Sequence, residues 1–268
     1  MRVAAVQMQS GSDKSSNLAQ AHELLLQALD RNVDLVAFPE NFALFTDQAE
    51  VWEQGSETLK GVLTETLQEW AAEYGVWILG GTIPLKAKGK SGKVTNTSLL
   101  VSPDGEVMAR YDKIHLFDSD LPGLAPIRES DDIEAGKKPV CAELPIGKAG
   151  LAVCYDIRFP ELFRKYAQLG AHVVFIPSAF IAQTGKAHWD VLTRARAIEN
   201  QAYVIAPAQW GAPFPGRETY GHTRIVDPWG RVIAERPAGT GVVWADLSVE
   251  RIEQVRAELP ALKHRVLK

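Results

Sequence analysis

The order of apolar and amphipathic segments along the 268-residue chain predicts an α/β fold. Short apolar runs alternate with helical patterns over the first two thirds of the chain, and short strands with turn signals follow. The runs VDLVAFP (33–39) and AHVVFIP (171–177) each close a strand–helix–strand unit, which suggests two similar halves. The pattern fits one mixed sheet, or two packed sheets with helices outside.

In the first half of the chain, short apolar or alternating segments predict strands at 2–9, 33–39 and 76–82, and the two segments that flank a turn signal predict strands at 94–101 and 106–112. Apolar residues at helical spacing predict helices at 17–31 and 59–74, and Gly75 is placed to end the second. Ser102-Pro103-Asp104-Gly105 predicts a tight turn, because proline presets φ and glycine tolerates a positive φ. Residues 86–93, KAKGKSGK, predict a solvated hairpin tip.

The second half opens on residues 116–139, which are rich in Pro, Asp and Gly and have no periodicity. A loop of that length in a compact domain is usually functional. Strands are predicted at 150–155, 171–177, 202–209, 220–226, 231–235 and 241–245. Helices are predicted at 160–169 and 187–201, and Ser248 is placed to cap a last helix that reaches Leu259.

The amino-acid composition and net charge of the chain exclude several classes of protein. Hydrophobic residues make up 46% of the chain, which suits a single domain over residues 1–268. The net charge of -4 and pI of about 5.9 argue against a nucleic-acid partner or a polybasic membrane patch. We expect no leader peptide, membrane span or metal site, since no segment or motif supports one. Two cysteines, Cys141 and Cys154, do not make a disulfide framework and favour the cytoplasm.

Three polar residues stand where predicted buried strands give way to loops. Glu40 follows VDLVAFP, Lys113 follows EVMARYD, and Cys154 follows GLAV. A carboxylate can take the proton of a thiol and later pass it to a leaving amine. A lysine ammonium and a backbone N–H after the cysteine can stabilise an oxyanion. The three residue types together therefore predict nucleophilic catalysis.

Each residue also has a plainer interpretation when taken alone. Cys154 could be a small core residue, and Glu40 and Lys113 could be exposed charges. Asp156 and Arg158 could pair with each other or pin the loop, or Arg158 could bind a substrate carboxylate with its two-pronged guanidinium. The combination of all three strand-end residues favours the catalytic interpretation.

Three sequence blocks resemble the signature blocks of the nitrilase superfamily, the carbon–nitrogen hydrolases. They are AFPE (37–40), YDKIHLF (111–117) and GLAVCYDIRFPE (150–161). The resemblance implies a Glu40–Lys113–Cys154 triad, with Glu129 as a supporting second glutamate. It also implies a four-layer αββα sandwich with mixed sheets and helices outside. The implied reaction proceeds at an amide or nitrile through a thioester, without a metal or cofactor, in a homodimer or larger assembly.

Within that superfamily the chain is most similar to the Nit branch, through the stretches 115–123, 128–136, 184–204 and 220–230. That branch includes amidases for deaminated glutathione and omega-amidases for 2-oxoglutaramate or 2-oxosuccinamate. The RARAIE run (194–199) and the LPG loop (121–123) resemble the deaminated glutathione group more, which implies that substrate first and makes omega-amidase activity the alternative. The resemblance implies a small-molecule amide substrate bound by Tyr155, Arg158 and Thr184. Lys186 and the insert-like segment 212–216 depart from the branch, which leaves substrate preference open. Acyl transfer and a catalytically silent binding protein are the remaining alternatives.

Overall fold

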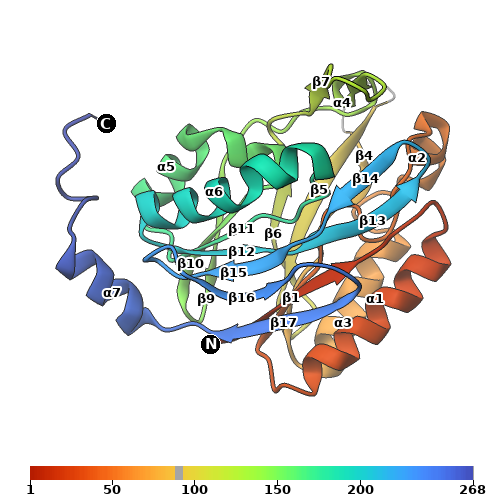
Figure 1. The fold of residues 1–268 in the computed structure, drawn as a ribbon. Helices are drawn as coiled ribbons and strands as arrows, with labels where there is room; N and C mark the ends of the chain where they lie inside the picture. Colours follow the sequence, from red (N-terminus) through yellow and green to blue (C-terminus); the bar gives the residue numbers. More distant parts are fainter. Residues whose placement is uncertain (88–92, 268) are drawn as a thin grey trace.

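The computed structural model describes residues 1–87 and 93–267, so most of the hairpin tip predicted at 86–93 lies outside the described residues. Two β-sheets pack face to face, and helices cover their outer faces (Figure 1). Helices α1 (Lys14–Leu29) and α3 (Val62–Tyr74) cover one sheet, and α5 (Pro160–Gln168) and α6 (Ala182–Asn200) cover the other. This arrangement is the αββα sandwich that the sequence resemblance implied.

The first sheet has a parallel centre flanked by antiparallel strands. Strands β1, β2 and β3 run parallel, while β3, β5 and β4 and the β5–β6 pair are antiparallel. Along its other edge, β1 pairs first with β17 and then with β13, which carries β14. The strands are β1 (Arg2–Met8), β2 (Leu35–Ala37), β3 (Trp77–Leu79), β4 (Ile83–Lys86), β5 (Val94–Val101), β6 (Val107–Asp112), β13 (Ala208–Phe214), β14 (Arg217–Tyr220) and β17 (Gly241–Asp246).

The second sheet has the order β16-β15-β12-β11-β10-β9. Its three central strands are parallel, and the outer ones are antiparallel to their neighbours. The strands are β9 (Val140–Leu144), β10 (Gly147–Leu151), β11 (Val173–Phe175), β12 (Tyr203–Ala206), β15 (Thr223–Val226) and β16 (Val232–Arg236). The unit β1–α1–β2 thus lies in the first sheet and its partial echo, β10–α5–β11, in the second.

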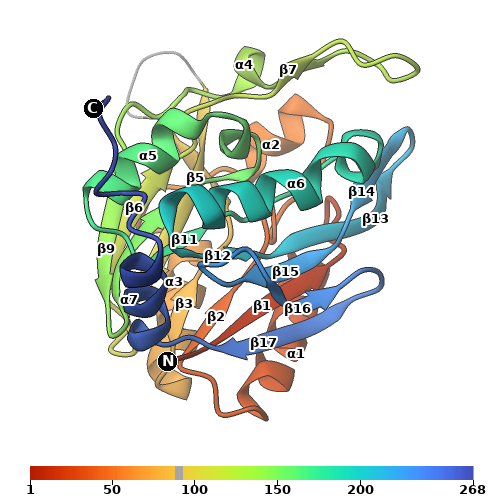
Figure 2. The same ribbon diagram turned by 60° about the vertical axis from the view of Figure 1, so that its left-hand side comes forward.

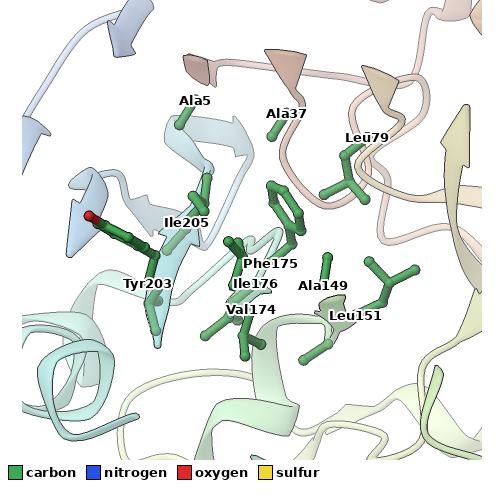
Figure 3. Packing of buried hydrophobic residues seen from close by; sticks show 14 of the residues in the cluster. Ala5, Ala37, Leu79, Ala149, Leu151, Val174, Phe175, Ile176, Tyr203 and Ile205 are labelled. Atoms are coloured by element: carbon green, nitrogen blue, oxygen red, sulfur yellow. The ribbon is translucent and has the colours of Figure 1, made fainter. Parts of the chain in front are cut away.

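Strand residues pack in alternation because successive side chains point to opposite faces of a sheet. Val3 and Ala5 of β1 belong to the core between the sheets, whereas Ala4 and Val6 belong to the core under α1 and α3. Figure 3 shows Ala5, Ala37 and Leu79 of the first sheet facing residues such as Leu151 and Phe175 of the second. Both faces of the centre of the first sheet are therefore buried, which explains why β2 and β3 are continuous apolar runs.

Two predicted strands each prove to be two strands in different sheets. The segment predicted as one strand at 202–209 forms β12 in the second sheet and β13 in the first, with Pro207 between them. The segment 220–226 likewise divides into the end of β14 and β15 around Gly221 and His222, which both have positive φ. These predictions were wrong because hydrophobic periodicity does not report which sheet a strand joins.

Several boundaries also differ from the predictions. The long segment 116–139 contains a small hairpin, β7 (Asp118–Ser119) with β8 (Ile127–Arg128), and a short helix, α4 (Glu129–Asp132), which project from the body (Figure 2). Helix α6 begins at Ala182, before the predicted residue 187, and β10 ends at Leu151. Helix α2 (Ala49–Gly55) was not predicted.

Local signals for the helix ends are confirmed. Gly75 ends α3 in the left-handed conformation, with φ of 64°. Ser248 Oγ accepts a hydrogen bond from the Arg251 N–H at 3.1 Å and caps α7 (Val249–Glu258). No helix of the described residues has the length and apolar character needed to cross a membrane.

Candidate active site

Three strand exits bring Glu40, Lys113 and Cys154 to the same pocket. Glu40 lies three residues after β2, Lys113 directly follows β6, and Cys154 opens the 3₁₀ helix η1 (Cys154–Arg158) after β10. All three line a cavity of about 410 Å³. The sequence predicted this convergence from the strand ends alone.

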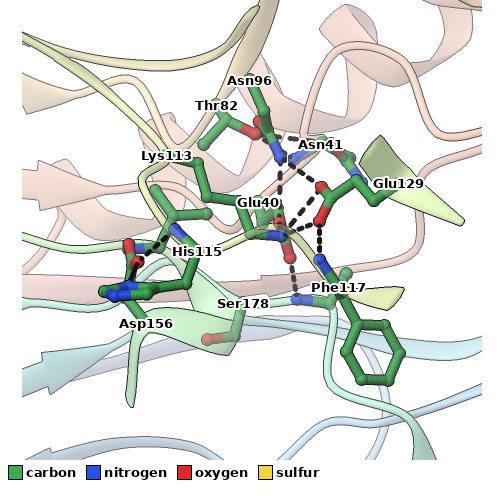
Figure 4. Close-up of polar contacts among 12 residues, drawn as sticks. Glu40, Asn41, Thr82, Asn96, Lys113, His115, Phe117, Glu129, Asp156 and Ser178 are labelled. Carbon is green, nitrogen blue, oxygen red and sulfur yellow. Dashed lines mark hydrogen bonds and ion pairs between the residues drawn. The ribbon is translucent and has the colours of Figure 1, made fainter. Parts of the chain in front are cut away.

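Lys113 is the centre of the cluster, as Figure 4 shows. Its Nζ lies 3.0 Å from Glu40 Oε1 and 2.8 Å from each carboxylate oxygen of Glu129. The side chains of Lys113 and Glu40 are only 2% and 4% exposed, and that of Glu129 is 14% exposed. A buried ammonium therefore lies between two carboxylates.

Burial alone would lower the pKa of Lys113, but the negative charges of Glu129 and Glu40 outweigh it and raise that pKa. The lysine consequently stays an ammonium at neutral pH. It holds a fixed positive charge beside the thiol of Cys154. This group can stabilise negative charge that develops on a substrate oxygen.

Glu40 is held by contacts from both sheets. Its Oε1 accepts a hydrogen bond from Asn96 Nδ2 at 3.0 Å, and its Oε2 accepts one from the Ala179 N–H at 2.8 Å. Gln209 Nε2 donates to its backbone carbonyl at 3.0 Å. The following residue, Asn41, has a positive φ of 60° and donates its N–H to Thr82 Oγ1. The carboxylate is thereby fixed in position before any substrate binds.

Cys154 lies in a left-handed backbone conformation, with φ of 45°, which is unusual for a residue other than glycine. Its N–H donates to the Pro177 carbonyl at 2.9 Å, which ties the turn to the end of β11. The thiol faces the Glu40 carboxylate and the Ala179 N–H. Such strained positions are common at functional sites.

Burial raises the pKa of the Cys154 thiol, and the negative charge of Glu40 raises it further, while Lys113 opposes both. The resting thiol is therefore protonated at neutral pH. Proton transfer from sulfur to an acceptor must accompany any attack by this thiol. Glu40, which faces it, is the acceptor that the geometry provides.

Asp156 organises the turn that carries Cys154 and does not pair with Arg158. This fully buried carboxylate accepts hydrogen bonds from Tyr111 Oη at 2.7 Å, the Val153 N–H at 2.8 Å and the His115 N–H at 3.0 Å. It also contacts His115 Nδ1 at 2.7 Å. The pairing that we considered for Asp156 and Arg158 is therefore wrong, because residues near the end of β6 occupy the carboxylate.

Glu129 comes from the long segment 116–139, as the resemblance implied, where it opens α4. Besides Lys113, it binds the Phe117 N–H at 2.5 Å through Oε2 and Asn96 Nδ2 at 3.4 Å through Oε1. Asn96 thus donates to both carboxylates of the cluster. Asn96 was not predicted as a site residue, although a polar amide side chain within the strand predicted at 94–101 could have indicated a role at the site.

The three residues expected to bind substrate all line the cavity. Arg158 Nη1 lies 3.1 Å from His188 Nδ1, and its guanidinium lies 5.7 Å and 5.0 Å from the ring centroids of Tyr155 and Phe180. Thr184 lies in the first turn of α6 and donates its hydroxyl to the Ile181 carbonyl at 3.3 Å. Arg158 is thereby held at the pocket wall with donors left for a ligand.

The two places where the sequence departs from the Nit branch, Lys186 and the segment 212–216, lie differently relative to the cavity. Lys186 is exposed on α6 and does not line the cavity, whereas Phe214, Pro215 and Gly216 do. Arg217, which directly follows, also lines the cavity and was missed by the sequence analysis. Among the residues that the structure describes, no group of three or more His, Cys, Asp or Glu side chains is arranged to hold a metal ion.

Comparisons with known proteins identify the family to which this chain belongs. Residues 2–257 match the family described as carbon-nitrogen hydrolase. The deaminated glutathione amidase of Synechocystis is 43% identical over 265 residues, which are 98% of this chain and 97% of that protein. The omega-amidase of Mus musculus is 35% identical over 270 residues, 98% of this chain and 94% of that protein.

Solved structures of proteins that resemble this chain in sequence have the same fold. The NitFhit protein of C. elegans superposes on this chain with a TM-score of 0.90 at 34% sequence identity. The match covers 99% of this chain but only 65% of the NitFhit chain, which is longer. Saccharomyces cerevisiae Nit3, of the nitrilase superfamily, gives 0.89 at 32% identity over 100% and 97% of the two chains. A variant of the amidase from Nesterenkonia sp. AN1, with acrylamide added at its active-site cysteine, gives 0.80 at 25% identity over 98% and 99%.

The position of Glu40 beside the thiol predicts the effect of removing its charge. We expect Glu40→Gln to lower the pKa of Cys154, because the negative charge that raises this pKa is gone while Lys113 remains. The measurement is a pH titration of thiolate absorbance in Cys141→Ala protein with and without Glu40→Gln.

Cys141 supplies the control. Its pKa is raised mainly by its own burial, so its titration in Cys154→Ala protein should not move with Glu40→Gln. An unchanged or higher pKa of Cys154 in the Glu40→Gln protein would show that the carboxylate does not act on the thiol.

Proposed function

Because the chain belongs to the carbon–nitrogen hydrolase family, we propose that this amidohydrolase cleaves a small 2-oxo acid amide, with deaminated glutathione as the first candidate. The observation that carries the proposal is the buried Lys113 between Glu40 and Glu129, with the Cys154 thiol facing Glu40. These groups supply a nucleophile, a proton acceptor and a fixed positive charge in one cavity.

In the first half of the proposed reaction, Cys154 Sγ attacks the amide carbonyl while Glu40 takes the thiol proton. The carbonyl oxygen becomes an oxyanion beside Lys113 Nζ and the Tyr155 N–H. That N–H lies in the first turn of η1, where backbone N–H groups lack a partner within the helix. Glu40 returns the proton to the nitrogen as the C–N bond breaks, which leaves a thioester.

In the second half, water attacks the thioester carbonyl and Glu40 takes its proton. The same two donors stabilise the second oxyanion. The C–S bond breaks, the carboxylic acid leaves, and Glu40 returns the proton to Cys154. In both halves Glu129 is a positioning residue, because it touches Lys113 and not the reacting atoms.

Arg158 and Thr184 are the proposed partners of the 2-oxo acid carboxylate. The guanidinium can donate two parallel hydrogen bonds, a geometry that a lysine does not reproduce. Arg158 lies four residues beyond Cys154, on the short helix that begins with it. An acyl group bound to Cys154 would therefore present its carboxylate to the same wall of the cavity. Tyr155 stacks against Arg158 and supports it.

Omega-amidase activity on 2-oxoglutaramate or 2-oxosuccinamate is the second candidate. 2-Oxoglutaramate would form the same acyl group as deaminated glutathione, and 2-oxosuccinamate one that is shorter by one carbon. The candidate is favoured by the similarity to the mouse omega-amidase. The higher identity to deaminated glutathione amidases places deaminated glutathione first. Acyl transfer to an amine or thiol and a silent binding role receive no comparable support.

Further expectations concern the organisation of the protein. We propose that residues 1–268 form one domain, since both sheets contribute residues to the core that lies between them. Free Cys141 and Cys154 support a cytoplasmic location. A homodimer that uses the outer face of α6 is supported by Val191 and Ile198, which are exposed and seven residues apart on one helix face.

The nucleophile can be tested with the two cysteines of the chain. We expect Cys154→Ala to lower the rate of deaminated glutathione hydrolysis by at least about 10³-fold, because no thioester can form. Release of cysteinylglycine measures the rate, and mass spectrometry of trapped enzyme should find the acyl group on Cys154. The matched control, Cys141→Ala, should retain activity, and robust turnover by Cys154→Ala would refute the mechanism.

Substrate recognition can be tested at Arg158. Arg158→Lys should reduce kcat/KM at least about tenfold for deaminated glutathione and 2-oxoglutaramate, since both carry the 2-oxo acid carboxylate. A neutral aliphatic amide should be a poor substrate of the wild type and should lose much less activity in the variant. Equal losses on all three substrates would assign Arg158 a structural role.

The oligomer can be tested by sedimentation velocity. We expect the wild-type chain to sediment as a dimer or larger species and Val191→Asp to shift it toward the monomer, because the charge would be buried in the interface. Leu26→Asp is a suitable control, since Leu26 is exposed on α1 at the opposite side of the sandwich. A monomeric wild type would refute the proposal.

A further inference from the structure

Arg217, the first residue of β14, brings a second guanidinium into the cavity that holds Cys154 and Arg158. It lies opposite Phe214 across an irregular part of the β13–β14 hairpin. Phe214 packs edge-on against Phe45, with ring centroids 5.5 Å apart, which anchors the hairpin to the loop after β2. Arg217 is therefore presented by a different element from the one that presents Arg158.

The charge of Arg217 has no protein partner in the part of the chain that the structure describes. None of the ion pairs there includes Arg217, and its buried Nε has no hydrogen-bond acceptor. Arg128, at the same cavity, is by contrast paired with Asp120 at 2.6 Å. A buried donor without an acceptor is rare in folded proteins, and here the open cavity is where an acceptor can enter.

The surroundings keep Arg217 a cation close to the reacting groups. Burial lowers its pKa, while the negative charges of Glu40 and Glu129 oppose that effect. An arginine side chain remains charged in proteins. The cavity thus contains an unpaired, partly desolvated positive charge in addition to the cation at Arg158.

Two guanidinium groups on separate elements exceed what one carboxylate requires, since a single guanidinium fork satisfies a carboxylate. Under the proposed function, Arg158 and Thr184 bind the carboxylate of the acyl group. A second anionic group of the substrate must then belong to the amine that leaves. The cavity of about 410 Å³ is within the usual range for small-molecule sites and has room beyond a primary amide.

We propose that Arg217 determines specificity by binding a carboxylate on the leaving amine, so that the preferred substrates are N-substituted amides with a carboxylate on each side of the scissile bond. This inference rests on the proposed function. Deaminated glutathione has this pattern, because its departing cysteinylglycine ends in a carboxylate. Primary omega-amides lack the second carboxylate, since they release ammonia. Arg217 thereby favours the first candidate substrate over the second.

The test compares kcat and KM for three substrates: deaminated glutathione, its C-terminal glycinamide analogue and 2-oxoglutaramate. In the wild type, amidating the glycine carboxylate should lower kcat/KM at least about tenfold, mainly through KM. In Arg217→Gln, the preference for the acid over its amide should disappear. The ratio of kcat/KM for deaminated glutathione to that for 2-oxoglutaramate should fall at least about tenfold. Arg217→Lys should restore part of both preferences, because it keeps the charge.

The controls separate this inference from the proposed function. Arg128→Gln removes a guanidinium that already has a partner, so both preferences should remain as in the wild type. The amidated substrate tests the wild-type enzyme directly, which covers the case that Arg217→Gln fails to fold. Equal use of acid and amide by the wild type, or an equal loss on all substrates in Arg217→Gln, would overturn the role of Arg217. A wild type that prefers a neutral aliphatic amide would instead overturn the proposed function.

Discussion

The ammonium of Lys113, buried between two carboxylates, is the constraint on which the rest of the site depends. A charge removed from water is tolerated only where opposite charges and hydrogen bonds compensate it, and loss of one partner of a buried pair typically costs about 3–5 kcal/mol. The fold must therefore deliver Glu40 from β2 and Glu129 from the segment 116–139 to one lysine. Burial of the thiol and the negative charge of Glu40 raise the pKa of Cys154 against the opposing charge of Lys113, which explains why Cys154 rests protonated.

The second requirement is the packing of the two sheets. Glu40 and Lys113 follow strands of the first sheet, whereas Cys154 and Ala179 follow strands of the second. The Ala179 N–H binds Glu40 across this boundary, and Gln209, from β13 just after the chain passes from the second sheet to the first, binds the Glu40 backbone. The distance from thiol to carboxylate is thus set by the core between the sheets, so packing and chemistry are coupled in this fold.

Local sequence determined the features whose physical cause is local. A glycine that tolerates positive φ ends α3, a serine hydroxyl caps α7, and the segment 94–101, which precedes a tight turn, forms β5 over that whole range. Such features depend on backbone sterics and on contacts within a few residues. The division of 202–209 between two sheets depends instead on which distant strands offer hydrogen bonds. The periodicity of hydrophobic residues within the segment does not indicate which strands those are.

The residues of the site likewise form two groups, those that the sequence indicates and those that only the folded structure reveals. The sequence pointed to Glu40, Lys113 and Cys154, because each lies at the end of a predicted strand and their residue types suit one chemistry, and the family resemblance added Glu129. Only the tertiary structure decided that Asp156 binds Tyr111 and His115, that Asn96 bridges both carboxylates, and that Arg217 enters the cavity unpaired. These residues act through partners far away in the chain. Their contacts, and hence their electrostatic environments, exist only once the two sheets have packed.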